Sequence, residues 1–583
     1  MMSFGSRNLT TLSLILIGFL SGQAMADPNL PWTLRNHYSI PLEEGVIIYA
    51  EDNGEWRVLM KDGTILANGI GFSIGLADGT ELTGLNLGDG SPSRDSFAHE
   101  LGDGTTYSVT FAPKNGLKVK HILRTFKARP FVFVEIEVEN VGTADVSITN
   151  IRPVFAETSV MQALSPQTRI HYRRMREMGG QPVVVSEKDA MMVVINDPTK
   201  SFCLGLGMMP AGPARSSISF RESKGEWHGD IICRYEPMKI LAPGETLASD
   251  PLWMSNGVPE SHRVDLYYAW SYSMYVDNPK SAFTARGWYT LTESNGLDDY
   301  RSSGSGWKGV GIDHVLLGRG WEGRPGSFQG AAPRFPKNMK SAVDALTGDG
   351  LQVGLTIDPL VAEAGGQSWT FESSDGQAWL NPGAPEAIKA IGDKLSTLKG
   401  MGAAFIVVDM SLIPDAALEA FRLTRAEAQN LAFKALRDGA DPLTVFPASS
   451  ALLRDDVNDW LDAGSAVARM AIYGVNPAPI RCDFSNGSDI TEDLGTAVSF
   501  WPGPIEFQGN VTRRLSDELG GMIRRARVAG QPMDAEMSSP RTWQVQDYDG
   551  EGKLTAERTV SVGGALATQV SNIVAPEATT PAS

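Results

Sequence analysis

The feature that most constrains this chain is a short apolar run at residues 403–410, AAFIVVDM, which contains one acidic residue, Asp409. Its β-branched character is typical of a strand buried on both faces of a parallel sheet. Residues 311–321 and 351–362 have the same character, and stretches of helical periodicity separate the three runs. This alternation predicts an α/β barrel, in which an acid that closes a strand lies at the open carboxyl end.

The size and charge of the chain restrict its organisation and its partners. Its 583 residues are too many for one hydrophobic core, so two or three domains are expected. The formal net charge of −17 argues against nucleic acid or an anionic membrane as the main partner. Small, neutral or sugar-like substrates are compatible with this charge, although charge alone does not select them.

Residues 1–26 have the pattern of a secretory signal peptide. Arg7 supplies the positive charge, residues 9–22 form the apolar stretch, and Ala24-Met25-Ala26 is a small-residue cleavage site. A membrane anchor is the alternative, but the apolar run is shorter than the ~20 residues that span a bilayer. We therefore expect a periplasmic or secreted protein without a membrane span after signal removal.

The rest of the chain divides into three regions. Residues 27–260 predict a large antiparallel β-sandwich, since runs such as 131–140 alternate apolar and acidic residues with a period of two. Residues 261–540 predict an α/β (β/α)8 TIM-type barrel. Residues 541–583 predict a short C-terminal segment and a disordered tail. The candidate barrel strands are residues 287–291, 313–317, 352–357, 405–409, 443–446, 467–472 and 497–501.

The predicted helices of the barrel region carry apolar residues at helical spacing. One face holds Met339, Ala342, Val343 and Leu346, and another holds Ile388, Ile391, Leu395 and Leu398. Residues 419–437 and 516–529 are further candidate helices.

The chain has three cysteines, Cys203, Cys233 and Cys482. Export permits a disulfide between Cys203 and Cys233, which belong to the same β-rich region. Burial as small apolar side chains is the alternative. The spacing of Cys and His residues indicates no metal site.

Asp409 is the first candidate for chemistry. A carboxylate that closes a buried strand is partly desolvated and oriented, which suits a nucleophile or a general base. A structural role in capping the next helix is the alternative. A glycosidase needs a second carboxylate, and Asp462, Asp483 and Asp489 are candidates on later segments.

Further residues could contact a substrate. Asp358 and Glu363 follow the strand predicted at 352–357, and they could also be paired residues of the rim. The tryptophans that could stack on a sugar ring include Trp288 and Trp321, although buried packing is the alternative for each. Arg319 and Arg469 could bind carboxylate or hydroxyl oxygens, or pair with nearby acids.

The order of these motifs resembles the melibiase-type α-galactosidases of glycoside hydrolase family 36, with relatives in families 27 and 31. The family's first strand carries Gly-Trp, as at Gly287-Trp288, and its FP-x-G(L/M)K helix start resembles residues 335–340. Its GLxxGLWxxP strand matches residues 350–359, and its nucleophile strand ends in an acid at the position of Asp409. The resemblance implies an N-terminal antiparallel β-supersandwich, a (β/α)8 barrel and Asp409 as the nucleophile.

The resemblance also implies the second catalytic residue. Residues 461–474 match the family's acid/base motif, with Asp462 as the general acid/base and Arg469 on the matching arginine. A rival alignment places Tyr473 there instead.

The chain departs from the family at two places. Its DDGW signature becomes Gly318-Arg319-Gly320-Trp321, so both sugar-binding acids are lost, and its strand lysine becomes Val407. Arg319 would favour an anionic or differently arranged sugar if it faces the pocket.

These arguments predict an exported retaining glycoside hydrolase, α-galactosidase-like, that acts on an α-linked oligosaccharide or glycoside. Asp409 and Asp462 would be catalytic, and Trp288, Arg319, Trp321, Asp358 and Arg469 would bind substrate. No metal or organic cofactor is expected. A degenerate carbohydrate-binding barrel and a transglycosidase are the alternatives, and the resemblance makes a homo-oligomer possible.

Overall fold

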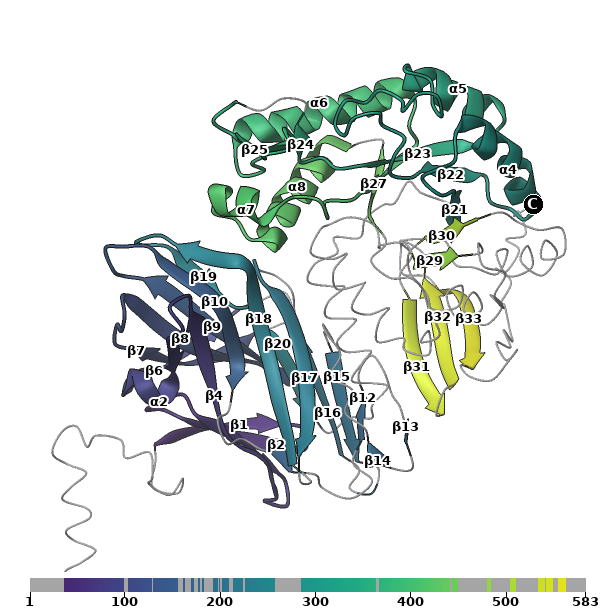
Figure 1. The fold of residues 1–583 in the computed structure, drawn as a ribbon. Coiled ribbons are helices and arrows are strands. Elements are labelled where there is room, and N and C mark those ends of the chain that lie inside the picture. Colours follow the sequence, from purple (N-terminus) through teal and green to yellow (C-terminus); the bar gives the residue numbers. More distant parts are fainter. Residues whose placement is uncertain are drawn as a thin grey trace, which may run out of the picture.

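The computed structural model describes most of two regions of the chain. The described residues are 36–98, 103–127, 129–155, 161–162, 169–171, 177–178, 181–182, 192–197, 199, 202–208, 213–223, 226–256, 285–362, 366–440, 443–448, 480–483, 504–509, 533–539, 542–548 and 554–561. An antiparallel β-rich region comes first, followed by a region where parallel strands alternate with helices (Figure 1). The predicted signal at 1–26 lies outside this part of the chain. No helix within the described part is long and apolar enough to cross a membrane.

The N-terminal region is built from two nine-stranded antiparallel sheets. The first contains β1 (His37–Leu42), β2 (Gly45–Ala50), β3 (Trp56–Met60), β4 (Ile65–Leu76), β5 (Glu81–Thr83), β10 (Val146–Phe155), β11 (Met161–Gln162), β17 (Arg215–Ser223) and β18 (Glu226–Leu241). The second contains β6 (Gly90–Phe97), β7 (Gly104–Phe111), β8 (Leu117–Phe126), β9 (Arg129–Asn140), β12 (Arg169–His171), β15 (Met192–Asp197), β16 (Phe202–Met208), β19 (Thr246–Ala248) and β20 (Leu252–Asn256). The short helix α2 (Gly84–Leu87) and the hairpin of β13 (Glu177–Met178) and β14 (Gln181–Pro182) complete the region.

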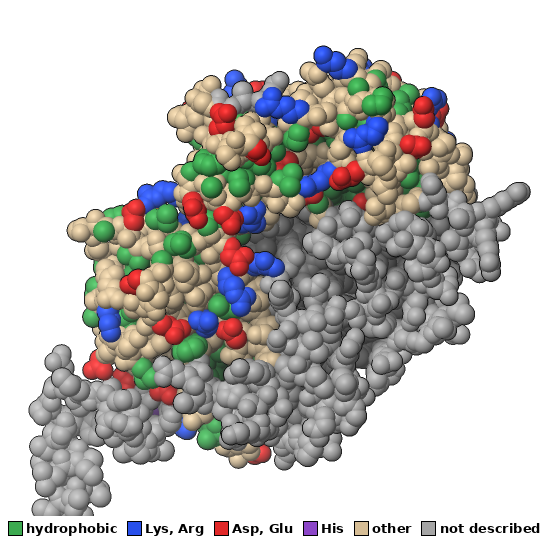
Figure 2. All heavy atoms as spheres, viewed as in Figure 1, with side chains coloured by type: hydrophobic (Ala, Val, Ile, Leu, Met, Phe, Trp, Pro, Cys, Tyr) green, Lys and Arg blue, Asp and Glu red, His purple; other side chains and the backbone are tan. Residues whose placement is uncertain are grey.

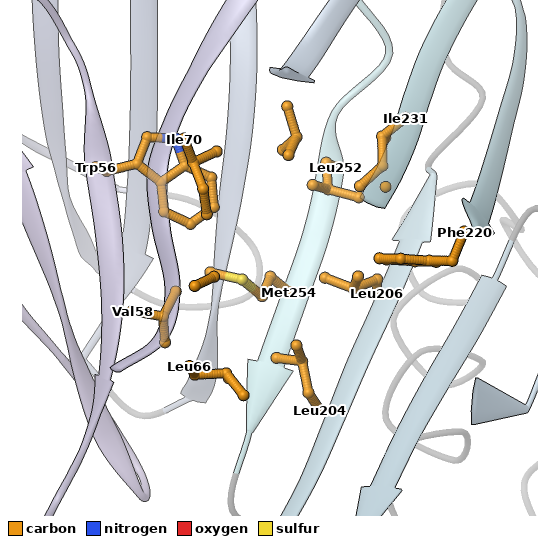
Figure 3. Close-up of a pocket in the computed structure, with 13 residues that line it drawn as sticks. Trp56, Val58, Leu66, Ile70, Leu204, Leu206, Phe220, Ile231, Leu252 and Met254 are labelled. Carbon is orange, nitrogen blue, oxygen red and sulfur yellow. The ribbon is translucent and has the colours of Figure 1, made fainter. Parts of the chain in front are cut away.

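The period-two pattern explains how these sheets pack. Along β9, the alternate residues Val132, Val134, Ile136 and Val138 are fully buried and belong to one apolar core. The prediction of an antiparallel β-rich N-terminal region is confirmed. The two sheets leave a cavity of about 60 Å³ between them, with Trp56 and Ile70 on one side and Leu206 and Met254 on the other (Figure 3).

Cys233 lies on β18 as a free, buried thiol, and burial raises its pKa. Cys203 lies on β16, in the other sheet. Of the two alternatives that the sequence left open, the disulfide between Cys203 and Cys233 does not form, and burial as a small side chain describes Cys233.

The second region is organised around one sheet of seven described strands, all paired in parallel, in the order β28-β27-β23-β22-β21-β30-β29. These strands are β21 (Gly287–Thr290), β22 (His314–Leu317), β23 (Gln352–Ile357), β27 (Phe405–Val408), β28 (Thr444–Pro447), β29 (Ile480–Asp483) and β30 (Ile505–Gln508). The first five confirm predicted strands. The predicted strands at 467–472 and 497–501 lie outside the described residues, and β29 and β30 were not predicted. Closure into an eight-stranded barrel stays a prediction.

Helices between the parallel strands bury their apolar faces against the sheet. They are α4 (Leu297–Gly309), α5 (Met339–Gly348), α6 (Pro385–Met401), α7 (Asp415–Phe421) and α8 (Arg425–Ala440). The predicted apolar face of α5 is buried as expected. On α6, Ala387 is buried with Ile391, while Ile388 is 44% exposed and was wrongly assigned to that face.

The helix predicted at 419–437 is two helices, α7 and α8. The helical conformation ends at Arg422, whose backbone is left-handed, with a φ of 59°, and which terminates α7.

Two small antiparallel sheets accompany the parallel strands. One contains β24 (Val361–Ala362), β25 (Thr370–Glu372) and β26 (Ala378–Leu380), and it lies beside α6 in Figure 1. The other contains β31 (Met533–Ser539), β32 (Thr542–Tyr548) and β33 (Leu554–Ser561). Strand β31 falls inside the span that was predicted to belong to the barrel.

The sandwich contacts the helices that follow β27. Lys239 Nζ on β18 lies 2.6 Å from Glu427 Oε1 on α8, and the hydroxyl of Thr424 donates to the Pro213 carbonyl at 2.6 Å. Arg422 pairs with Asp145 at the same boundary. On the face drawn in Figure 2, acidic and basic side chains are interspersed over the described residues.

Candidate active site

The parallel strands bring two carboxylates to the same edge of the sheet. Phe405 and Val407 point into an apolar layer with Trp288, Leu316 and Phe446. Since side chains alternate along a strand, Asp409 follows on the same side as Val407. Thr356 is paired with Val407, so Asp358 is the lateral neighbour of Asp409. The Asp409 N–H donates to the Ile357 carbonyl at 2.9 Å, which extends the ladder to this point.

The carboxylate of Asp409 is oriented by one of its oxygens. Oδ1 accepts the N–H of Ser411 at 3.1 Å and lies 2.6 Å from Arg319 Nη2. The same Nη2 donates to the Ser411 hydroxyl at 2.8 Å. Oδ2 has no hydrogen-bond partner among the described residues, and the Asp409 side chain is 22% exposed. The structure thus brings together Asp409 and Arg319, two of the predicted site residues.

Asp358 lies next to Asp409, at the end of the neighbouring strand β23. Its Oδ1 accepts the N–H of Leu360 at 2.9 Å, while its Oδ2 is shielded from solvent and has no hydrogen-bond partner in the described part of the chain. Burial raises the pKa of Asp358 to about 7, and the charge of Asp409 contributes to this rise. The Leu360 N–H and the charges of Lys394 and Arg319 act in the opposite direction.

Two further charged residues, Lys394 beside Asp358 and Glu322 beside Lys394, were not predicted from the sequence. Lys394 on α6 donates to the carbonyls of Pro359, at 2.7 Å, and Val361, and burial lowers its pKa to about 8. Glu322 accepts the N–H groups of Phe328 and Gly326 at 3.0 and 3.2 Å, and burial raises its pKa. Lys394 lies three residues after Ile391, on the apolar face of α6, and this position in the sequence was a signal that the lysine is buried.

The turn that carries Arg319 is shaped by its glycines. Gly320 has a φ of 89°, a left-handed conformation that favours glycine. Its carbonyl accepts a hydrogen bond from Arg334 Nη2 at 2.9 Å. Trp321 then turns inward and donates its ring N–H to the Thr356 carbonyl at 2.8 Å.

The two tryptophans predicted to bind substrate are both buried. Trp321 is 1% exposed, and Trp288 is fully buried between Phe405 and Phe446, with ring centroids 4.9 and 5.0 Å away. Buried packing, the alternative that the sequence allowed, describes both side chains.

Several predicted site residues lie outside the described residues. They are Asp462 and Arg469, together with the alternatives Glu363, Tyr473 and Asp489. Asp483 ends β29, which is described by its backbone. The catalytic role of Asp462 and the binding role of Arg469 stay predictions. Within the described chain, no group of three or more His, Cys, Asp or Glu side chains is arranged to hold a metal ion.

The arrangement of an antiparallel sandwich before a parallel α/β sheet is also found in known glycoside hydrolases. No protein-family model and no curated protein sequence matches this chain. Among solved structures, the family 36 α-galactosidase AgaA of Geobacillus stearothermophilus has a TM-score of 0.57 at 10% identity, with 92% of this chain and 93% of that chain covered.

Two further solved structures have the same fold. An α-galactosidase of Lactobacillus brevis has a TM-score of 0.56 at 12% identity, and the match covers 92% of this chain and 90% of that one. The α-N-acetylgalactosaminidase NagBb of Bifidobacterium bifidum has a TM-score of 0.58 at 12% identity, with 90% and 98% covered. The predicted resemblance to family 36 is confirmed at the level of the fold.

Proposed function

We propose that this protein is an α-glycosidase that works by a retaining mechanism with two carboxylates. The observation that carries the proposal is the carboxylate of Asp409, which closes β27 at the edge where the parallel strands end. Such an edge is where the active sites of α/β barrels lie. The fold likeness to α-galactosidases and to an α-N-acetylgalactosaminidase supports the same reaction class.

The geometry of Asp409 fits a nucleophile. Ser411 and Arg319 hold Oδ1, so Oδ2, which has no partner among the described residues, is the atom that would attack the anomeric carbon and form the glycosyl-enzyme. Asp462 would protonate the leaving oxygen and then activate water, which in a retaining enzyme requires it to stand ~5–5.5 Å from Asp409. Two structures of a protein with this fold contain stachyose and raffinose, which supports an oligosaccharide substrate.

Replacement of the nucleophile tests the proposal. Asp409→Asn is expected to lower the turnover of an aryl α-glycoside by at least about 1000-fold, because the amide cannot form the glycosyl-enzyme. The thermal midpoint should change little, since the side chain is partly exposed. In Asp409→Gly, which leaves room beside the anomeric carbon, azide should restore turnover with inverted product if Asp409 is the nucleophile. Unchanged turnover of Asp409→Asn would overturn the assignment.

A carbohydrate-binding protein without hydrolytic activity is the second candidate. The direct pairing of Arg319 with Asp409 favours it, because an ion pair reduces the freedom of the carboxylate to attack. Binding of a sugar by the wild-type protein without turnover of any aryl α-glycoside would support this candidate.

We also propose that the protein acts after export, on the basis of the signal pattern at residues 1–26. Expression of the full chain in a bacterial host followed by N-terminal sequencing of the periplasmic fraction tests this point, with Asp27 as the expected first residue. Full-length protein confined to the cytoplasm would contradict it.

A further inference from the structure

Asp358 and Asp409 are neighbours across two parallel strands. Ile357 on β23 is paired with Val408 on β27, so the next residue after each of them carries a carboxyl group. Adjacent strands lie ~4.8 Å apart, and residues in register point to the same face of a sheet. Two carboxylates at such a separation repel each other. One of the two is therefore expected to keep its proton at a pH where an isolated aspartate is ionised.

The surroundings of the two carboxyl groups decide which one keeps the proton. Asp409 is partly exposed, its Oδ1 lies 2.6 Å from Arg319 Nη2, and the same oxygen accepts the Ser411 N–H. The carboxyl group of Asp358 has a single hydrogen bond within the described residues, from the Leu360 N–H to Oδ1. Its Oδ2 is shielded from solvent and has no partner there. A charge on this oxygen would be desolvated without compensation, so the proton belongs to Asp358.

Charged groups from three elements act on Asp358 within the described part of the chain. Burial raises the pKa of Asp358 to about 7, and the charge of Asp409 adds to this rise. The charges of Lys394 on α6 and of Arg319 act in the opposite direction. The Lys394 ammonium donates to two backbone carbonyls, and Glu322 acts on it as well as Asp358. Asp409 therefore has a direct ion pair, while the carboxyl group of Asp358 has none within the described residues.

We propose that Asp358 is a positioning residue for the nucleophile, which keeps its own proton and thereby leaves the charge of Arg319 to Asp409. This inference rests on the proposed function. Arg319 contacts Asp409 Oδ1 and the Ser411 hydroxyl through Nη2, while its Nε and Nη1 have no partner among the described residues. When Asp358 loses its proton to solvent, the new negative charge attracts the same guanidinium away from Oδ1. Oδ2 of Asp409 then loses its fixed direction, and the rate of attack on the anomeric carbon falls.

Infrared titration of the full chain locates the proton without requiring turnover. The C=O band of a protonated carboxyl group that Asp358→Asn removes should disappear from the wild-type spectrum around pH 7. Asp409→Asn removes a neighbouring negative charge, so the midpoint of this band should fall by about one pH unit. Arg319→Gln removes a positive charge, so the midpoint should rise. Asp344→Asn, at an exposed position on α5, is the control and should leave the band unchanged.

Two infrared results would overturn the inference. One is the absence of any band that titrates with Asp358. The other is a midpoint that moves in neither Asp409→Asn nor Arg319→Gln, because Asp358 would then be independent of the pair that it is proposed to position.

The pH dependence of kcat/KM tests the effect on the nucleophile. The substrate is an aryl α-glycoside whose phenol is strongly acidic, because its departure needs little help from a general acid. We expect the wild-type kcat/KM to fall above about pH 7, approaching tenfold for each pH unit, and that of Asp358→Asn to persist to higher pH. Asp344→Asn should follow the wild type. The neutral amide of Asn keeps the shape of the protonated carboxyl group, so a purely structural role would not produce this change in the profile.

The activity measurements also separate the inference from the proposed function. An Asp358→Asn profile that falls at the same pH as the wild type would overturn the inference and leave the proposed function standing. A wild-type protein that cleaves no aryl α-glycoside would overturn the proposed function and, with it, the positioning role, whatever the infrared midpoints.

Discussion

Arg319 Nη2 lies 2.6 Å from Oδ1 of Asp409, so the residue that replaces an acid of the family 36 signature is paired directly with the proposed nucleophile. The same Oδ1 accepts the Ser411 N–H, which leaves Oδ2 as the oxygen available for attack. Arg319 is therefore a group that orients the carboxylate of Asp409. This relationship makes the exact position of Asp409 as important as its charge.

Asp409→Glu tests the importance of position. Glutamate keeps the charge but displaces the carboxylate by one methylene, and a shift of ~1 Å can cost about 100-fold in rate. We expect kcat for an aryl α-glycoside to fall by about that factor, with a smaller change in KM. Asp415→Glu, at an exposed helix start six residues later, is the control and should leave kcat unchanged. Full kcat in Asp409→Glu would show that the position of this carboxylate does not matter.

Asp358 is expected to make stability depend on pH. Burial raises its pKa to about 7, while an unfolded aspartate titrates near pH 4, so the folded state binds more protons between these values. Stability contributed by this group therefore falls as pH rises from about 4 to about 7. Asp358→Asn removes this pH dependence. Relative to wild type, its free energy of unfolding should rise with pH across this window, by at most roughly 1.4 kcal/mol for each pH unit. Its thermal midpoint relative to wild type should rise in the same direction.

The control for this prediction is Asp375, whose pKa is lowered chiefly by the hydroxyl of Ser373. Its contribution is present above its unfolded pKa and is lost as pH falls. Asp375→Asn should therefore show no relative gain between pH 5 and pH 7. A difference between Asp358→Asn and wild type that does not change with pH would contradict a raised pKa for the Asp358 carboxyl.

Lys394 is expected to stabilise the segment after β23. Its ammonium donates to the carbonyls of Pro359 and Val361, and Lys394→Met would leave both without this donor. The loss should cost about 2–4 kcal/mol, since buried groups without partners retain their desolvation cost. Hydrogen exchange at β24 should accelerate in this variant. Lys389→Met, at an exposed position on the same helix, should leave exchange unchanged.

Glu427 is expected to hold the sandwich against the helices. Its Oε1 lies 2.6 Å from Lys239 Nζ, its Oε2 accepts the Thr424 N–H at 2.8 Å, and both charged side chains are largely buried. Glu427→Ala should cost about 3–5 kcal/mol because it leaves a buried ammonium unpaired. The exposed pair of Lys118 and Glu139 is the comparison, and Glu139→Ala should cost at most about 1 kcal/mol. Equal changes in the thermal midpoint would show that the boundary pair contributes little.

The sequence was sufficient to predict the strands whose apolar runs are continuous. Residues 352–357 and 405–409 are uninterrupted β-branched segments, and the structure places β23 and β27 there. Strand β30 was not predicted because Glu506, which is 2% exposed, interrupts its apolar pattern. A buried acid within a strand has no local signal that distinguishes it from a residue of a loop.

The site was less predictable than the strands because its contacts join distant segments. Asp409 could be placed at the carboxyl end of a strand from local pattern alone. Its pairing with Arg319 depends on the turn at Gly320, and the proximity of Lys394 to Asp358 depends on how α6 packs. Neither relationship is encoded by spacing along the chain.

Variants of Trp288 can distinguish a role in core packing from a role in substrate binding. Its ring is fully buried and contacts Phe405 and Phe446, so its removal should create a cavity. Trp288→Ala should cost about 3–5 kcal/mol of stability, as large-to-small changes in a core do, and Trp288→Phe should cost less. If packing is the role of Trp288, the folded fraction of Trp288→Phe should bind substrate with an unchanged KM. A KM that rises at least about tenfold while the thermal midpoint stays constant would instead mean that the ring contacts the sugar. Measuring KM and the thermal midpoint on the same preparation distinguishes these two outcomes.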